Sequence, residues 1–201
     1  MADVIKSFVE GKFPQVTTTV YTVPVGKYAV TKSILVCNDS NTDATVRISI
    51  GSTWIIYNHV IKANATLLID DLDLPILAGE TITIYGSLST CNLFIAGFER
   101  EYVSGDYPYS VINVTANSSS ASTLIGFDSV IKSIILSSNT SGVSNVNVYN
   151  SVKFISAKEI KAGDTLIIPM AKMFVPKGRN LTYNTVGNSC RITFILEKVG
   201  D

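Results

Sequence analysis

The side chains best suited to chemistry in this sequence are one histidine and three neighbouring aspartates. His59 is the only histidine, and it has no second histidine or cysteine at a spacing that completes a zinc site or a catalytic triad. Asp70, Asp71 and Asp73 lie together, and such carboxylates can bind Ca²⁺ or do acid–base work. They lack the glycine and glutamate of an EF-hand loop. We expect a solvated His59 and a solvated turn at the aspartates, with a structural cation or catalysis as alternatives for the turn.

Two lysines and several glycines recur in similar surroundings. Lys32 and Lys132 lie inside apolar strands, each followed by serine, and we expect them to point outward along half-buried strands. The alternative is a contact with a partner's carboxylate. Gly79, Gly163 and Gly178 precede strands and suit turns, and no helix follows that would make a phosphate loop. We therefore predict no catalytic, cofactor-binding or metal-binding residue, and a protein that is not an enzyme.

The polar residues must be positioned by a fold that the sequence contains twice. Residues 30–36 return as residues 130–136, at an offset of 100 (30 to 130). Residues 61–69 return as residues 160–168, at an offset of 99 (61 to 160). This period is longer than the roughly 20–50 residues of a solenoid repeat and matches a whole domain. The sequence therefore predicts a tandem duplication of one small domain.

Comparison of the two copies distinguishes residues that the fold requires from residues that occur in one copy only. Lys158 stands where the first copy has His59, and Pro-Met-Ala-Lys stands where it has the aspartates, so the fold requires neither. Cys91 and Cys190 match each other, and together with Cys37 they lack the CxxC spacing of zinc or redox sites. We expect buried free thiols, as suits a protein made in a reducing cytoplasm.

From residue 16 onward the pattern is strand, turn, strand. Residues 44–50 alternate with period two, which is typical of a half-buried strand. The inward residues are Val46, Ile48 and Ile50, and the outward residues are Thr45, Arg47 and Ser49. Short strands spaced by roughly 8–12 residues, with polar turns between them, predict a sandwich, jelly roll or small barrel. The expected fold is all-β, with two tandem homologous antiparallel β-sandwich domains, jelly-roll or Ig-like, and a short N-terminal arm.

We place the N-terminal arm at residues 1–15, the first sandwich domain at residues 16–103 and the second at residues 104–201. The apolar residues of the arm have helix-like spacing. They are Val4, Ile5, Phe8 and Val9. We expect the arm to be helical or extended and to dock on a neighbour or on its own domain.

A short linker at residues 101–108 joins the two domains, so we expect them to be held at a fairly fixed angle. Tyr102, Tyr107 and Tyr109 flank this linker. Filling a seam between the domains is the simpler role for them, and stacking on sugars or on a partner protein is the alternative.

The composition is low in charge. Hydrophobic residues make up 46% of the chain and charged residues only 16%, against about 25% charged in typical soluble domains. This favours buried partner surfaces, the alternative being a sandwich covered by Ser, Thr and Asn. The net charge of zero, with scattered Lys and Arg, argues against nucleic acid. We also expect no transmembrane span, because no apolar run approaches about 18–20 residues, and no secretory signal, because the start lacks a continuous apolar stretch.

The first copy resembles a β-sandwich module of tailed-bacteriophage virion proteins. The resemblance rests on residues 20–27 (Val-Tyr-Thr-Val-Pro-Val-Gly-Lys), residues 29–38, the strand at 44–50, the turn at 77–81 and the ending Ala-Gly-Phe-Glu at 96–99. It covers nearly all of the first copy. The second copy matches only in part, because it lacks the Pro-Val-Gly turn and the Gly-Phe-Glu ending.

This resemblance implies a non-enzymatic virion structural protein without a cofactor, of the capsid auxiliary or decoration (cement) type, that binds and stabilises the head shell. The implied partners are the major capsid protein or other virion proteins, in a homo-oligomer such as a trimer or a ring. The implied location is the virion, assembled in the cytoplasm of the bacterial host. The alternatives are a neck, tail or fibre-attachment protein and a carbohydrate- or receptor-binding adhesin module.

Overall fold

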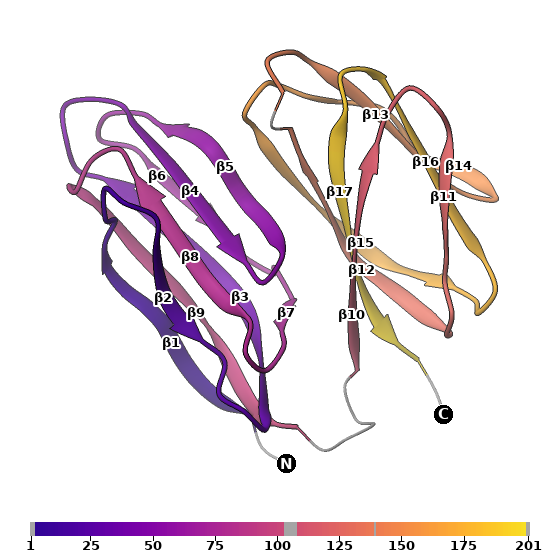
Figure 1. Ribbon diagram of the computed structural model, residues 1–201, viewed down its shortest axis with the longest axis horizontal. Coiled ribbons are helices and arrows are strands. Elements are labelled where there is room, and N and C mark those ends of the chain that lie inside the picture. Colours follow the sequence, from indigo (N-terminus) through magenta and orange to yellow (C-terminus); the bar gives the residue numbers. More distant parts are fainter. Residues whose placement is uncertain (1–2, 103–107, 139, 200–201) are drawn as a thin grey trace. The chain divides into compact units, whose positions relative to one another are not determined.

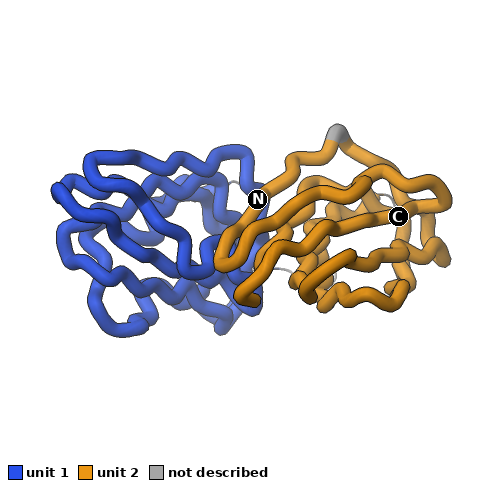
Figure 2. The backbone as a smooth tube through the Cα atoms, turned by 90° about the horizontal axis from the view of Figure 1, so that it is seen from above, with its two compact units in different colours: residues 1–107 blue, residues 108–201 orange. Residues whose placement is uncertain are grey.

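The computed structural model describes residues 3–102, 108–138 and 140–199, which form antiparallel β-sheets and contain no helix (Figure 1). The chain divides into two compact units, residues 1–107 (unit 1) and residues 108–201 (unit 2) (Figure 2). Among the described residues, no helix is present that has the length and hydrophobicity to span a membrane.

Unit 1 contains two sheets that enclose a core. The first sheet has the order β1-β9-β3-β6, with β7 also paired to β3, and the second has the order β2-β8-β4-β5. The strands are β1 (Val4–Lys12), β2 (Thr18–Thr22), β3 (Lys27–Asn38), β4 (Ala44–Ile50), β5 (Thr53–Ile61), β6 (Thr66–Ile69), β7 (Leu74–Ile76), β8 (Thr81–Gly86) and β9 (Cys91–Glu101).

Unit 2 repeats this architecture. Its first sheet has the order β10-β17-β12-β15 and its second the order β11-β16-β13-β14. The strands are β10 (Tyr109–Ala116), β11 (Ala121–Leu124), β12 (Ser129–Ser137), β13 (Ser144–Asn150), β14 (Val152–Ile160), β15 (Thr165–Val175), β16 (Asn180–Gly187) and β17 (Cys190–Lys198).

The two units follow one strand order, and β15 alone takes the place that β6 and β7 share in unit 1. Two antiparallel layers connected in this way form a double-sheet sandwich of the jelly-roll type. The predicted fold class, all-β with two tandem homologous sandwiches, is confirmed.

The alternation predicted for residues 44–50 is also confirmed. Val46, Ile48 and Ile50 are buried in the core, while the residues between them lie half-buried on the outer face of the sheet. In unit 2 the matching strand places Val146 and Val148 in a core that Phe194 also fills. Apolar residues at every second position therefore fix which face of each sheet is inside.

The arm expected at residues 1–15 contributes a strand to unit 1. Residues Val4–Lys12 form β1, which pairs antiparallel with β9 at the edge of the first sheet. The extended alternative is therefore found, and the helical one is not. A bulge between Ser7 and Val9 turns Phe8 into the core, where its ring lies 4.8 Å from that of Tyr21. Because a bulge inserts one residue, it breaks the period of two and produces apolar spacing that resembles a helix.

Candidate functional site

The three clustered aspartates lie in an irregular segment between β6 and β7. Asp71 and Asp73 have positive φ values of 51° and 40°. Leu72 between them is buried, and its N–H donates to the carbonyl of Lys32 at 3.1 Å. Asp73 forms an ion pair with Lys32. Packing of Leu72 and this ion pair therefore hold the turn, and the described residues include no group of three His, Cys, Asp or Glu placed to bind a metal.

The two repeated lysines both pair with carboxylates of their own chain. Lys132 Nζ lies 3.3 Å from a carboxylate oxygen of Glu197 on β17. Unit 2 cannot use the pairing found in unit 1, because Lys172 stands where unit 1 has Asp73. Each lysine is thus matched with a carboxylate from a different neighbour, the segment before β7 in unit 1 and β17 in unit 2. The alternative role, binding a partner's carboxylate, is not needed to explain either residue.

The remaining sequence candidates are spread over the two units. His59 lies half-buried in β5, opposite Val46. Tyr102 is exposed just after β9, and Tyr109 begins β10. Tyr107 lies outside the described residues. His59 and Tyr102 belong to unit 1 and Tyr109 to unit 2, and the proposed roles of these residues remain predictions.

The cysteines are free thiols, as predicted, and two of the three are buried. Cys91 and Cys190 lie in the cores of units 1 and 2, whereas Cys37 is half-buried on β3. Burial raises the pKa of Cys190 to about 12 and also raises the pKa of Cys91. These two thiols therefore stay protonated at neutral pH and are poor nucleophiles.

A buried carboxylate, Glu99, joins four strands at one end of unit 1. Its oxygens accept hydrogen bonds from Lys6 Nζ at 2.5 Å, Tyr21 Oη at 2.5 Å and Lys27 Nζ at 3.0 Å. Burial acts to raise the pKa of Glu99, but these hydrogen bonds outweigh it and lower the pKa to about 2. A carboxylate that is permanently ionised and bonded to three donors is a poor general base, so we assign it a structural role in tying both sheets together.

Sequence reasoning missed a cluster of aromatic side chains around an arginine on the outer face of the second sheet of unit 1. We call it the Arg47 cluster; its members are Arg47, Trp54, Tyr57, Asn58 and Tyr85. The guanidinium carbon of Arg47 lies 5.7 Å from the ring centroid of Tyr57 and 5.0 Å from that of Tyr85. Its Nε donates to the side-chain oxygen of Asn58, a residue with a positive φ of 51°.

Three strands supply these side chains. Arg47 on β4 stands directly opposite Tyr85 on β8, and β5, on the other side of β4, carries the remaining members. Trp54 contacts Tyr57 edge-on, with ring centroids 5.1 Å apart and planes at 78°. All five side chains are half-buried. The arrangement therefore fixes one guanidinium between aromatic rings at a surface.

Unit 2 replaces the Arg47 cluster with a ladder of amides. Asn147 and Asn184 stand at the places of Arg47 and Tyr85, and the Nδ2 of Asn147 donates to the Oδ1 of Asn184 at 2.9 Å. The Oδ1 of Asn147 accepts a hydrogen bond from the backbone N–H of Ala157, also at 2.9 Å. The fold is built without the arginine and its rings, so the cluster belongs to unit 1 alone.

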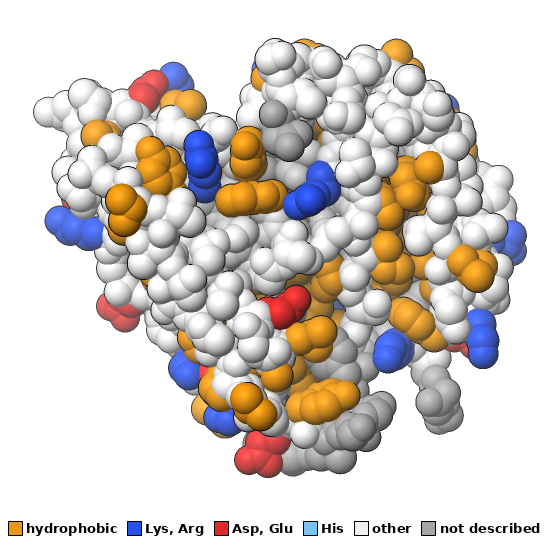
Figure 3. Space-filling view, viewed as in Figure 1, with side chains coloured by type: hydrophobic (Ala, Val, Ile, Leu, Met, Phe, Trp, Pro, Cys, Tyr) orange, Lys and Arg blue, Asp and Glu red, His pale blue; other side chains and the backbone are white. Residues whose placement is uncertain are grey.

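A second surface of unit 1 is an apolar row across the outer face of the first sheet. Leu35 on β3 lies opposite Phe94 on β9 and Leu68 on β6. Their exposed fractions are 36%, 37% and 57%. Directly opposite side chains contact each other in antiparallel sheets, so the three form one continuous strip. Figure 3 shows hydrophobic side chains at the surface of the face in view.

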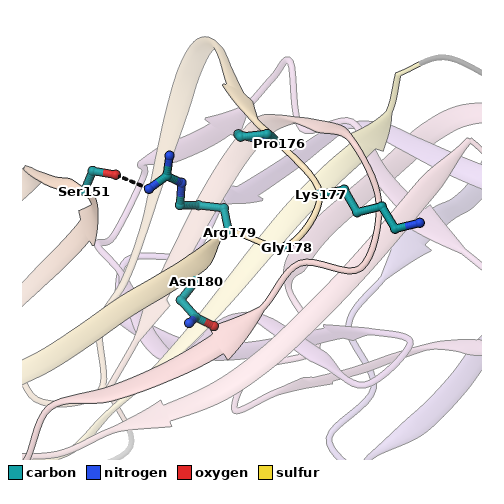
Figure 4. Close-up of a pocket in the computed structure, with 6 residues that line it drawn as sticks. All are labelled: Ser151, Pro176, Lys177, Gly178, Arg179 and Asn180. Atoms are coloured by element: carbon teal, nitrogen blue, oxygen red, sulfur yellow. Dashed lines mark hydrogen bonds between the residues drawn. The ribbon is translucent and has the colours of Figure 1, made fainter.

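A polar pocket of about 440 Å³ lies at one corner of unit 2, lined by Ser151, Pro176, Lys177, Gly178, Arg179 and Asn180 (Figure 4). Arg179 Nη1 donates to the hydroxyl of Ser151 at 2.7 Å. The backbone N–H groups of the turn are also bonded, to Asp128, Ile125 and Pro176. Lys177 extends away from Arg179 (Figure 4), so the two cations do not converge on one anion.

Comparisons with known proteins identify no family for this chain. No protein-family model matches it, and no curated protein matches it in sequence. Solved structures with some backbone similarity include the major capsid protein P2 of bacteriophage PM2, 9% identical, covering 99% of this chain and 98% of that one, with a TM-score of 0.37. A conserved protein of unknown function from Pseudomonas aeruginosa is 9% identical, covering 92% of this chain and 78% of that one, with a TM-score of 0.32.

A chain from the structure of Sulfolobus Turreted Icosahedral Virus is 13% identical, covering 95% of this chain and 60% of that one, with a TM-score of 0.26. These identities and TM-scores are low, so the similarities assign neither a family nor a function.

Proposed function

We propose that this protein is a non-enzymatic structural component of a bacteriophage virion, of the auxiliary or decoration type, that binds neighbouring subunits and stabilises the head shell. The observation that carries the proposal is the apolar row of Leu35, Leu68 and Phe94 on the outer face of a sheet. Outer faces of antiparallel sheets that meet only water are normally polar. An apolar strip there favours a surface that is covered by a partner.

Two further features support this role. Charged residues make up only 16% of the chain, as expected where much of the surface is buried in contacts. The first unit also carries the residues that resemble tailed-phage virion modules, including the turn at residues 77–81. The buried Glu99 and the repeated lysines Lys32 and Lys132, in contrast, form structural contacts within their own units.

The tandem units also suit a symmetric assembly. Three chains with two similar units each present six modules, which fit a three-fold or six-fold position. We therefore propose a trimer or ring, with the major capsid protein or other virion proteins as partners. The repeated strand order of units 1 and 2 makes such a near-equivalent arrangement geometrically possible.

The test is to compare virions made with and without this protein, and with the variant Leu35→Glu. We expect particles that lack the protein to assemble but to lose DNA at lower temperature or under osmotic shock. Leu35→Glu introduces a charge into the apolar row and should abolish attachment to the particle. Leu124→Glu is the matched control, because Leu124 is 64% exposed in unit 2 and lies outside the row.

Two results would overturn the decoration role. Heads of full stability that lack tails or fail to adsorb would indicate the neck, tail or fibre-attachment alternative. Binding to a glycan array by the isolated chain, with no attachment to particles, would indicate the adhesin alternative.

A further inference from the structure

The guanidinium of Arg47 is held in one orientation. The rings of Tyr57 and Tyr85 stack against it at 5.7 and 5.0 Å, and its Nε is bonded to Asn58. A guanidinium has five N–H donors in a rigid plane. Since only the Nε is bonded within the described ranges, the terminal nitrogens of Arg47 can bind a ligand without first being ordered.

A second arginine of unit 1 shows what completes such an arrangement. Arg100 also lies over two rings, 5.9 Å from the centroid of Tyr28 and 5.8 Å from that of Phe98. In that case, a carboxylate of the same chain is added: Arg100 Nη2 lies 2.5 Å from Asp3 Oδ1. Arg47 forms no ion pair within residues 3–102, 108–138 and 140–199.

We infer that the Arg47 cluster is a binding site for a carboxylate presented by an acidic peptide segment of a neighbouring protein. The charge at the site is complementary, because the cluster contains one cation and no acid. Arginine pairs with a carboxylate through two parallel hydrogen bonds. Half-buried rings around the guanidinium lower the local dielectric and strengthen that pair. Trp, Tyr and Arg are also the residues that contribute most to binding at protein interfaces.

A peptide fits the cluster better than an acidic sugar. Sugars stack on open ring faces, and here the guanidinium already covers one face of Tyr57 and of Tyr85. Trp54 contacts the ring of Tyr57 as well. The source of the peptide, a neighbouring virion protein, rests on the proposed function, but carboxylate binding is a property of the isolated chain.

The test uses the intact protein and the fluorescence of Trp54, the only tryptophan of the sequence. The probe is a capped penta-glutamate peptide, compared with capped penta-glutamine and with sialyllactose. We expect penta-glutamate to change the emission saturably, with binding that weakens as salt is added. Arg47→Lys should reduce the affinity by about tenfold or more, because lysine cannot form the two parallel hydrogen bonds.

The matched control is Arg100→Lys, which alters a stacked arginine that already has its carboxylate. It should leave the affinity for penta-glutamate unchanged. Thermal unfolding of both variants verifies that they are folded, and Arg47→Met provides a second variant without charge.

Equal binding of penta-glutamine would overturn the inference, since the site would then be apolar rather than acid-specific. Binding of sialyllactose alone would show that the cluster binds glycans instead. No response to any probe at millimolar concentration would show that the cluster is not a binding site. Peptide binding by an isolated chain that never attaches to virions would sustain this inference and contradict the proposed function.

Discussion

Units 1 and 2 have the same strand order, yet different side chains make the stabilising contacts at matching positions. At the bulge of β3 in unit 1, Lys32 pairs with Asp73, whereas Lys132 at the corresponding bulge of β12 pairs with Glu197. At the end of the sandwich, the buried Glu99 of unit 1 is replaced by Lys198. Both units therefore keep the bulge and its lysine, Lys32 or Lys132, but the carboxylate that pairs with the lysine differs.

The backbone is the better preserved part of the comparison. Positive φ values recur at matching positions in both units, at Asp73 and Lys172 and at Asn58 and Ala157. An alanine or lysine in this conformation costs about 1 kcal/mol or more, so the chain accepts strain to keep the bend. The fold therefore requires the backbone conformation at these positions, whereas the side chains of unit 1 can differ from those of unit 2.

The largest expected effect comes from Gly97 of β9. A Cβ at this position would overlap the carbonyl oxygen of Val30 and lie 2.8 Å from the ring of Phe8. Unit 2 has Leu196 at the matching place, where β10 pairs with β17 without a bulge. Gly97→Ala should therefore destabilise unit 1 by about 3 kcal/mol, through overpacking.

Denaturant unfolding followed by Trp54 fluorescence measures this change, since Trp54 is the only tryptophan and lies in unit 1. The control is Gly126→Ala in unit 2, where a Cβ would have no neighbour within 4 Å. It should change the stability of unit 2 by less than about 0.5 kcal/mol, as measured by hydrogen exchange of that unit. Equal effects of the two substitutions would mean that the close approach of Val30 and Phe8 does not set the requirement for glycine.

The next effect comes from Glu99. Glu99→Gln removes the charge that three donors bind, and should cost unit 1 about 2 kcal/mol, because Lys6 and Lys27 remain without their common carboxylate. Lys198→Gln at the matching place of unit 2 is the control and should cost less than about 0.5 kcal/mol. Hydrogen exchange measured by mass spectrometry separates the two units, and increased exchange confined to β1, β2, β3 and β9 would support the role of Glu99.

The carboxylate of Glu99 also makes the stability of unit 1 at low pH differ from that of unit 2. The folded-state pKa of Glu99 is about 2, below its usual value of 4.5, so its contribution to stability is complete above about pH 4.5 and is lost as the pH falls toward 2. Trp54 fluorescence should therefore report a loss of unit 1 stability across this range, and Glu99→Gln should flatten that dependence. An unchanged acid profile in the variant would assign the acid sensitivity to other groups.

The smallest effect on stability is expected from the ion pairs of Lys32 and Lys132. The pair of Lys32 and Asp73 is partly exposed, with side-chain exposures of 43% and 18%, so Asp73→Asn should cost only about 0.5 kcal/mol. Glu197→Gln should have a similarly small effect on unit 2. A double-mutant cycle with Lys32→Met measures the pair itself, and a coupling well above that of an exposed pair would show that unit 1 depends on its particular partner.

Sequence patterns predicted most of the fold. The repeat and the alternation of residues 44–50 depend only on which face of a strand is buried, and both reappear in the structure. The form of residues 1–15 stayed open, because a bulge at Ser7 to Val9 gives the apolar spacing of a helix. Local spacing does not reveal that β9, far along the chain, provides the partner strand.

The Arg47 cluster was not predicted, for a related reason. Alternation placed Arg47 on the outer face, but its neighbours Tyr57 and Tyr85 come from other strands. The sequence of neither strand alone determines the pairing register that brings these residues together. The usable signals were the single Trp54 and the substitution of Arg47 by Asn147 in the second copy.

The pairing of β1 with β9 also determines the order in which unit 1 can form during translation. The ribosome makes Val4–Lys12 early, but their partner, Cys91–Glu101, emerges only after all the other strands of the unit. Until then, β1 has no hydrogen-bonding neighbour in its sheet. Pairing between such distant segments is slow, and unpaired strands aggregate. Completion of unit 1 is therefore a long-range pairing step, which the modest size of the unit does not imply.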